Sequence, residues 1–183
     1  GMSISTAMSE KRLDRSEIEP VLTAILLQQG FSSDKAQLCA HLFTETTLDG
    51  VYSHGLNRFP VFIDAVQRGV VRPDQEPERV RSVNSFETWD GHLGPGNLNA
   101  WTCMGRAVAL AKDNGIGVVA LRNTNHWMRG ANYGWQAADA GCIGICWTNT
   151  EPNVPPWGGV RSGVGNNPLV IAVPRSAGHV VLD

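Results

Sequence analysis

Two separate stretches of the sequence place a histidine close to an arginine, and the first of them suits reduction of a carbonyl group. In the first, "GVYSHGLNRFP" (residues 50–60), His54 precedes Arg58 by four positions. A histidine near its ordinary pKa delivers a proton at neutral pH, and an arginine within reach binds a carboxylate through two parallel hydrogen bonds. The pair therefore suits a 2-oxo acid. The alternative is that Ser53 or Asn57 caps a helix and that both charged side chains are solvated.

The second stretch is "RNTNHWMRG", residues 122–130, which directly follows an apolar run. In α/β sheets the functional loops lie at the carboxyl ends of parallel strands. His126 stands there among asparagines and arginines, and Trp127 and Met128 add an apolar wall. The alternative is a surface loop that holds a structural tryptophan.

A third stretch, "GVGNNPLV" (residues 163–170), lies at a junction between a loop and an apolar run. Its glycines allow close backbone approach, and Asn166 and Asn167 offer amide contacts without charge. Glycine and asparagine are also ordinary loop residues, so the motif alone does not define a site.

The segment "GIGVVA", residues 115–120, matches the G-x-G-x-x-A pattern of dinucleotide-binding turns. That pattern binds a pyrophosphate only where a strand precedes it and a helix follows. Here a predicted helix precedes it and a predicted strand follows. The glycines are therefore interpreted as a helix stop.

The four cysteines form no C-x-x-C pair. Cys142 and Cys146 lie four positions apart in an apolar run, where both would point to one face of a strand. Zinc binding is one interpretation, but two buried small hydrophobic residues explain the pattern better. We predict no metal site and a reduced, cytoplasmic protein.

The elements that must position the histidines begin with a helical layer over residues 13–70. Ser16 and Glu19 have the spacing of a capping box, and Gly30 supplies a stop. A second helix is predicted from about Ser33 to 49–50. A third is predicted within "FPVFIDAVQRG", where the proline is tolerated only in the first turn. His54 then lies where two helices meet.

After residue 70 the pattern alternates between helix and strand. The polar stretch "RPDQEPERVRS" is predicted to be a connection, and "FETWDGHLGPGN" a short strand followed by a loop. Further helices are predicted in "NLNAWTCMGRAVALAKDNG" and "ANYGWQAADAG", and further strands in "GVVALRN", "CIGICWTN", "LVIAVP" and "GHVVLD". The fold class is α/β: a helical N-terminal layer followed by a non-Rossmann mixed sheet with flanking helices.

Composition excludes several classes of protein. With 183 residues, 42% hydrophobic and 17% charged, the chain is predicted to be a well-packed soluble protein rather than a disordered one. A net charge of −2 offers no footprint for nucleic acid or for an anionic membrane. Residues 1–12 are expected to form a flexible arm in which Gly1 is left over from expression. The stop at Asp183, inside an apolar run, predicts an incomplete sheet and a fragment.

Taken together, these stretches resemble the type-2 malate/L-lactate dehydrogenases, which are NAD(P)-dependent oxidoreductases unrelated to the Rossmann-fold enzymes of similar name. The blocks S-H-G-x-x-R-F and N-H-W-M-R-G carry the resemblance, which runs from about residue 14 to the last residue. It implies reduction of a 2-oxo or 2,3-dioxo acid, such as 2,3-diketo-L-gulonate, to the hydroxy acid.

The resemblance also implies roles for individual residues. His54 would be the proton donor, Arg58 would contact the substrate carboxylate, and His126 would line the site near the nicotinamide. Asn166 stands where the family usually has threonine. The residues implied on the cofactor side, with NADH favoured over NADPH, are Asn167, Pro168, His179, Val180, Val181, Leu182 and Asp183.

Family members are longer than this chain, so residues 71–183 are interpreted as the first part of a cofactor- and substrate-binding domain. The resemblance implies a homodimer. The alternative, which belongs to a different class, is a catalytically silent N-terminal fragment that acts only as an oligomerising or binding module, because a strand cut short leaves unpaired backbone groups.

Overall fold

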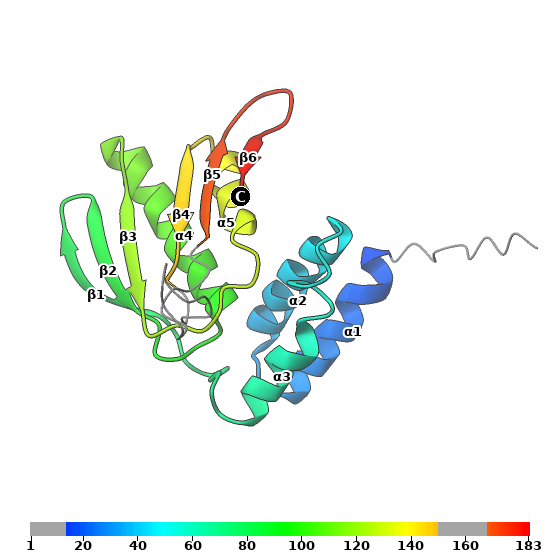
Figure 1. The fold of residues 1–183 in the computed structure, drawn as a ribbon. Coiled ribbons are helices and arrows are strands. Elements are labelled where there is room, and N and C mark those ends of the chain that lie inside the picture. The colour runs from blue at the N-terminus through cyan, green and yellow to red at the C-terminus, as the bar shows by residue number, and fades with distance from the viewer. Residues whose placement is uncertain (1–13, 150–167) are drawn as a thin grey trace, which may run out of the picture.

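A computed structural model describes residues 14–149 and 168–183. The expected N-terminal arm and both asparagines of "GVGNNPLV" lie outside the described residues. Figure 1 shows three helices side by side in one layer and the strands with two further helices in another. The elements are α1 Arg15–Gln28, α2 Ser33–Leu48, α3 Phe59–Gln67, β1 Glu78–Val83, β2 Phe86–Asp90, α4 Gly96–Asn114, β3 Val118–Arg122, α5 Ala131–Asp139, β4 Gly144–Trp147, β5 Leu169–Val173 and β6 Val180–Leu182.

The helical layer follows the sequence pattern closely. α2 begins after Ser32, whose hydroxyl accepts from the backbone N–H of Lys35, and α3 carries Pro60 in its first turn, as expected. The capping box predicted at Ser16 is wrong. Asp14 is the N-cap of α1, and its carboxylate accepts from the backbone N–H of Ser16, which therefore lies inside the helix.

The core of this layer is aromatic. Phe43 of α2 lies 5.1 Å from Phe59 in an edge-to-face arrangement and 5.3 Å from Phe62, measured between ring centroids. Leu26 of α1 is fully buried against them. This packing fixes where α2 ends and α3 begins, and so fixes the turn that carries His54.

The first sheet has the order β1-β2-β3. β1 pairs antiparallel with β2, and β2 pairs parallel with β3 through α4. The polar connection predicted around 72–82 therefore contains a strand. All residues of β1 are exposed, so no alternation of buried and exposed positions marks it in the sequence.

The turn between α4 and β3 has the order expected from "GIGVVA". Gly115 ends α4 with φ 85°, in the left-handed region that glycine tolerates. A Cβ at Gly117 would overlap with the backbone of Ala107 and lie 2.8 Å from Leu110. These glycines serve helix termination and close packing.

The second sheet, β4-β5-β6, is antiparallel and separate from the first in the described residues. The expectation of one mixed sheet is therefore corrected to two small sheets, of which the first is mixed. Cys142 precedes β4 while Cys146 lies in it, so the two do not share a strand face as expected. Within the described part of the chain no cluster of three metal-binding side chains occurs.

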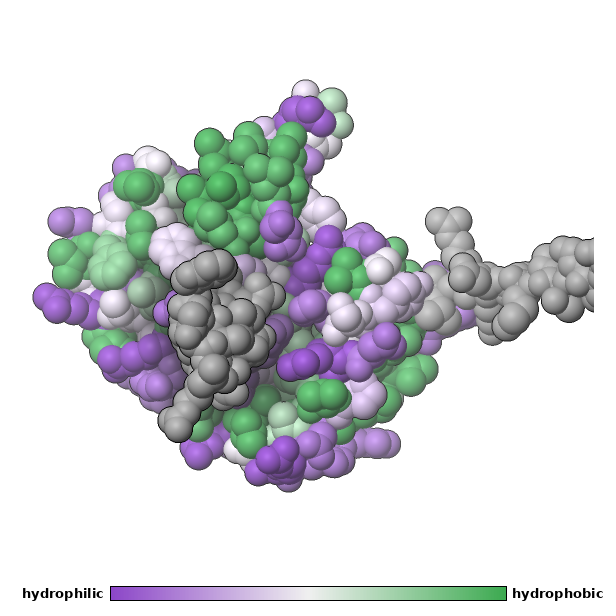
Figure 2. Space-filling model, in the orientation of Figure 1, coloured by the Kyte–Doolittle hydropathy of each residue, from purple (hydrophilic) through white to green (hydrophobic). Residues whose placement is uncertain are grey.

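The two faces of the second sheet differ. Val170 and Ala172 are buried under α5, where Gly134 allows close approach. In the described residues the opposite face is apolar and exposed, although these strands were predicted to be buried, because α5 covers only one side. Figure 2 shows apolar side chains gathered over this region, and the exposed ones are Ile145, Trp147, Leu169, Val173, Val180 and Leu182.

No helix in residues 14–149 and 168–183 is both long enough and apolar enough to cross a bilayer.

A buried ion pair joins the first sheet to α4. The side chain of Glu87 is 1% exposed, and Arg106 of α4 donates to its two carboxylate oxygens at 3.0 and 2.8 Å. Trp89 and Arg79 donate to it as well. The hydrogen bonds from Arg106 lower the pKa of Glu87 to about 2.

We expect Glu87→Gln to lower the free energy of unfolding at neutral pH by about 3 kcal/mol, since the pKa is lowered from 4.5 to about 2. The carboxylate contributes fully above its unfolded pKa and loses this contribution as the pH falls toward the folded pKa. The difference between the variant and the wild type should therefore shrink below about pH 4. Urea unfolding at two pH values measures it.

The matched control is Glu78→Gln on β1, because that carboxylate is 69% exposed and pairs with His92 at the surface. Its effect should stay below about 1 kcal/mol. Equal effects of the two substitutions would contradict the role of Glu87.

Candidate active site

The turn that carries His54 is held from beneath by Thr47 of α2. The buried Thr47 hydroxyl accepts from the backbone N–H of Leu56 at 2.8 Å and donates to the carbonyl of Phe43 at 2.8 Å. A Cβ at Gly55 would overlap with Thr47, so the turn packs closely only because residue 55 is glycine. His54 is thereby placed on a braced turn rather than on a free loop.

His54 itself is exposed at the surface of this turn. Its Nδ1 lies 2.9 Å from the hydroxyl of Ser53. Arg58 is partly buried and occupies the N-cap position of α3. The four-residue spacing therefore spans one turn and the start of a helix, and the capping role considered for Ser53 and Asn57 is absent, since no side chain caps α3.

The loop that carries His126 is anchored through Asn125. The Asn125 side-chain amide donates to the carbonyls of Val70, Leu93 and Gly94 at 3.3, 3.0 and 3.1 Å. Two N–H groups thus serve three acceptors that come from two other segments of the chain. The position of residue 126 is fixed by its neighbour.

The start of α4 lies directly behind this loop. A Cβ at Gly96 would overlap with the carbonyl oxygens of Asn125 and His126. Only glycine allows the first turn of α4 to approach so closely. The "GPGN" segment, predicted only as a loop, thus supports the His126 backbone.

The other end of the loop is tied to α2. Arg129 pairs with Asp49 at the carboxyl end of α2 at 2.6 Å, and the Asn132 amide donates to the buried Thr46 hydroxyl at 3.0 Å. The guanidinium of Arg129 also lies over the ring of Trp135, at 4.8 Å from its centroid. These contacts join two parts of the chain that are about eighty residues apart.

As a result, the structure brings together the two histidines that the sequence presents separately. The rings of His54 and His126 are stacked, with 6.0 Å between centroids and 30° between planes. Partial desolvation lowers the pKa of His126, and the positive charges of Arg58 and His54 lower it further. The Nδ1 of His126 accepts from the backbone N–H of Met128 at 2.9 Å.

The residues expected on the cofactor side lie in the second sheet. Pro168 precedes β5, and Val180, Val181 and Leu182 form β6, followed by Asp183. His179 is held in the preceding turn, where its Nε2 lies 2.8 Å from Asp139 and its Nδ1 accepts from the backbone N–H of Arg175. Within the described residues no hydrogen bond or ion pair joins this segment to the histidine pair. Cofactor binding by these residues stays a prediction.

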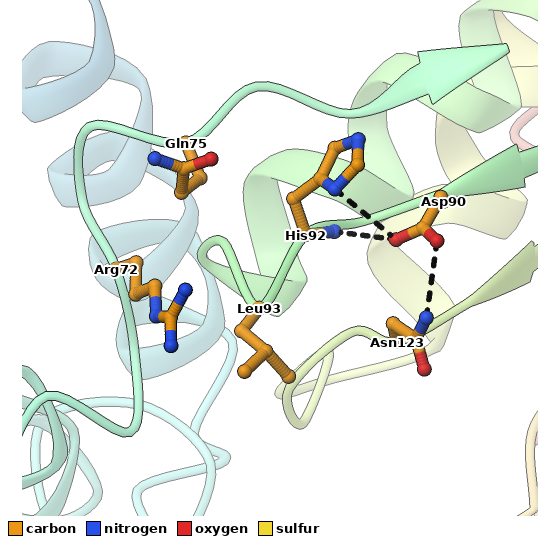
Figure 3. Close-up of a pocket in the computed structure, with 6 residues that line it drawn as sticks. All are labelled: Arg72, Gln75, Asp90, His92, Leu93 and Asn123. Carbon is orange, nitrogen blue, oxygen red and sulfur yellow. Dashed lines mark hydrogen bonds and ion pairs between the residues drawn. The ribbon is translucent and has the colours of Figure 1, made fainter.

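A surface cavity on the first sheet lies apart from His54 and His126. It has a volume of about 300 Å³ and is lined by neither histidine (Figure 3). The Asp90 carboxylate accepts from the backbone N–H of His92 at 2.9 Å, which lowers its pKa, and from the Asn123 amide at 3.0 Å. The lining residues are Arg72, Gln75, Asp90, His92, Leu93 and Asn123.

Some site residues were not found from the sequence. Asp49, Thr46 and Thr47 end a helix, and nothing in their local pattern distinguishes them from solvated polar residues. Asn132 was interpreted only as part of a helix. The common signal would have been a run of threonines on the buried side of α2, where a hydroxyl needs a partner.

Comparisons with known proteins identify the family of the chain. The family described as malate/L-lactate dehydrogenase matches residues 13–183. The chain is 49% identical over 160 residues to 2,3-diketo-L-gulonate reductases of Escherichia coli O139:H28 and Citrobacter koseri, which covers 87% of this chain and 48% of each relative. The chain spans about half the length of these curated relatives.

Solved structures of other dehydrogenases have the same fold over this part of their chains. Malate dehydrogenase from Pyrococcus horikoshii OT3 matches with a TM-score of 0.90 and 32% identity, over 93% of this chain and 49% of that one. Sulfolactate dehydrogenase from Methanocaldococcus jannaschii matches with a TM-score of 0.89 and 33% identity, over 93% and 50%. The predicted α/β fold and the family resemblance are confirmed.

We expect Gly96→Ala to shift the backbone of residues 125–126 and to destabilise the fold by about 1–3 kcal/mol, because the added methyl group has no space. Gly105→Ala, on the same helix, is the matched control. A Cβ there meets only the Gln136 amide at 3.7 Å, and alanine favours a helix interior by up to about 1 kcal/mol. Urea unfolding and backbone amide chemical shifts measure both effects. Unchanged shifts at the His126 loop in the Gly96 variant would contradict this packing.

Proposed function

The chain belongs to the malate/L-lactate dehydrogenase family, and from that premise we propose that the whole protein reduces the carbonyl of a 2-oxo or 2,3-dioxo acid to the hydroxy acid. The observation that carries the proposal is the stacking of His54 on His126 beside Arg58. The name of the 2,3-diketo-L-gulonate reductases supports a sugar acid as the substrate.

His54 is the proton donor in this proposal. The Ser53 hydroxyl occupies its Nδ1 side, and no partner of its Nε2 occurs among the described residues. Nε2 is therefore available to the carbonyl oxygen, which takes the proton as the carbonyl carbon takes a hydride. Because His54 is exposed, it regains a proton from water after each turnover.

Arg58 orients the substrate. Arg58 occupies the N-cap position of α3, four residues after His54, and its positive charge acts on His126. A carboxylate held by two parallel hydrogen bonds fixes the direction of the neighbouring carbonyl, and fixed orientation lowers the barrier.

The second sheet offers a surface that fits a nicotinamide cofactor. β6 is an edge strand in the described residues, and Val180 and Leu182 expose apolar side chains beside its free backbone edge. Apolar surface next to N–H and C=O groups suits a flat ring that carries an amide. A reduced nicotinamide, when bound, supplies the hydride. The residues proposed to hold it are Asn167, Pro168 and 179–183, with NADH preferred over NADPH.

We expect His54→Gln in the whole protein to lower kcat/KM for 2,3-diketo-L-gulonate by about 10²–10⁴-fold, because glutamine cannot donate a proton in general acid catalysis. NADH binding, followed by fluorescence titration, should stay near the wild-type value. His41→Gln is the control, since that histidine lies in an exposed cluster with Arg15 and Glu19. Wild-type turnover by the His54 variant would remove the assignment.

A second candidate function, a catalytically silent oligomerising module, is favoured by the open apolar face of the second sheet. Such a face gains free energy when a partner covers it. If association is the function, the 183-residue chain should elute as a dimer or larger species in size-exclusion chromatography, and it should not bind NADH. A compact monomer that binds NADH saturably would contradict this candidate.

A further inference from the structure

We propose that the backbone N–H of Met128 locks His126 as the neutral tautomer with its proton on Nε2, so that His126 is a permanent uncharged hydrogen-bond donor while His54 alone exchanges a proton. The substrate part of this inference rests on the proposed function. The tautomer part rests only on the geometry of the loop.

The hydrogen bond between Met128 and His126 decides the tautomer. A backbone N–H can only donate, so the Nδ1 atom that it reaches at 2.9 Å must carry a lone pair. A neutral imidazole has one N–H, which is then on Nε2. Turning the ring over would place a carbon against the Met128 N–H and leave that donor without its acceptor.

His126 is exposed, and its hydrogen bond and its charged neighbours oppose a second proton on the ring. It would have to sit on Nδ1, where it would face the Met128 N–H donor to donor. Arg58 at the start of α3 and His54 on the turn add positive charge nearby. Arg129, in the same loop, is paired with Asp49. Partial desolvation and these charges act in the same direction, and both lower the pKa of His126.

The loop cannot easily turn the Met128 N–H away. Met128 is buried and has φ 66°, a conformation that a non-glycine residue adopts only when its surroundings impose it. The Tyr133 hydroxyl donates to the carbonyl of Trp127, and Asn125 is held by three carbonyls. These contacts hold the residues on either side of His126 in the chain, so the Met128 N–H stays directed at the His126 ring.

The locked tautomer has a consequence for substrate choice. Nδ1 is occupied by the N–H of its own loop, so Nε2–H is the donor that this ring can offer to a substrate, and the ring centroid lies 6.0 Å from that of His54. If Arg58 takes the carboxylate and His54 the reacting carbonyl, His126 is left for a further oxygen on the adjacent carbon. The geometry therefore favours 2-oxo acids that carry an oxygen at C3, and it leaves a donor unpaired when a methyl group stands there.

Nuclear magnetic resonance of the whole protein, labelled with ¹⁵N only in histidine, tests the tautomer directly. Long-range ¹H–¹⁵N correlations distinguish a bare Nδ1 from a protonated one, and His126→Gln assigns the signals. We expect a neutral ring with bare Nδ1 at neutral pH, and a second proton only at a pH below the ordinary pKa of histidine. A proton on Nδ1, or a charged ring at neutral pH, would overturn the lock. No turnover is needed, so this result is independent of whether the proposed reaction is correct.

Matched substrates test the second part. Hydroxypyruvate and pyruvate differ at C3 by one hydroxyl group. We expect kcat/KM to favour hydroxypyruvate by about ten-fold or more. His126→Phe keeps a flat ring beside His54 and should abolish this preference, whereas His126→Gln keeps a neutral N–H donor and should retain part of it, with the pH profile unchanged. A preference that survives in the phenylalanine variant would exclude His126 as the C3 contact.

Discussion

The ion pair between Arg129 and Asp49 is the constraint on which the site depends. It joins the loop after β3 to the end of α2, and Asn132 and Thr46 repeat the same link one turn further into each helix. The Arg129 side chain is 15% exposed and that of Asp49 is 32% exposed, so the charge pair is only partly screened by water and salt. It also lies at the carboxyl end of α2, where the helix dipole favours a cation. Together the two links hold the His126 loop against the end of α2, from which the turn with His54 leads.

The sequence predicted most of the helices and strands, but it did not predict which of them pack or pair with one another. The periodicity of α2 and α4 and the glycine at residue 115 predicted these boundaries well, because helix formation and termination are local. β1 was missed because an edge strand with every side chain exposed needs no apolar alternation. Asp14 was missed as the cap of α1 because Ser16 offered an equally good local pattern.

Local sequence patterns did not predict which distant residues and strands contact one another. Glu87 lies in a stretch that predicts only a short strand, yet it is the most buried carboxylate of the described residues, and Arg106 on α4, nineteen residues later, donates to it. The division into two sheets is also non-local, since each strand shows its apolar residues but not its neighbour. His54 and His126 were each identified as candidates, but their stacking follows from contacts made by Asp49 and Asn132, whose side chains carry no signal of their own.

Electrostatic repulsion disfavours a positive charge on both histidines of the pair at the same time. Two unit charges at 6 Å repel by about 3 kcal/mol at the effective dielectric constant of a protein surface, and Arg58 already adds one charge. The pair therefore holds one proton more easily than two. The Met128 N–H determines which ring stays neutral, since it occupies Nδ1 of His126, while the Ser53 hydroxyl beside His54 can donate or accept and so permits either state. In the proposed reaction, a fixed backbone donor on His126 and a rotatable hydroxyl beside His54 would give the two rings different roles, one as a hydrogen-bond donor and the other as the acid.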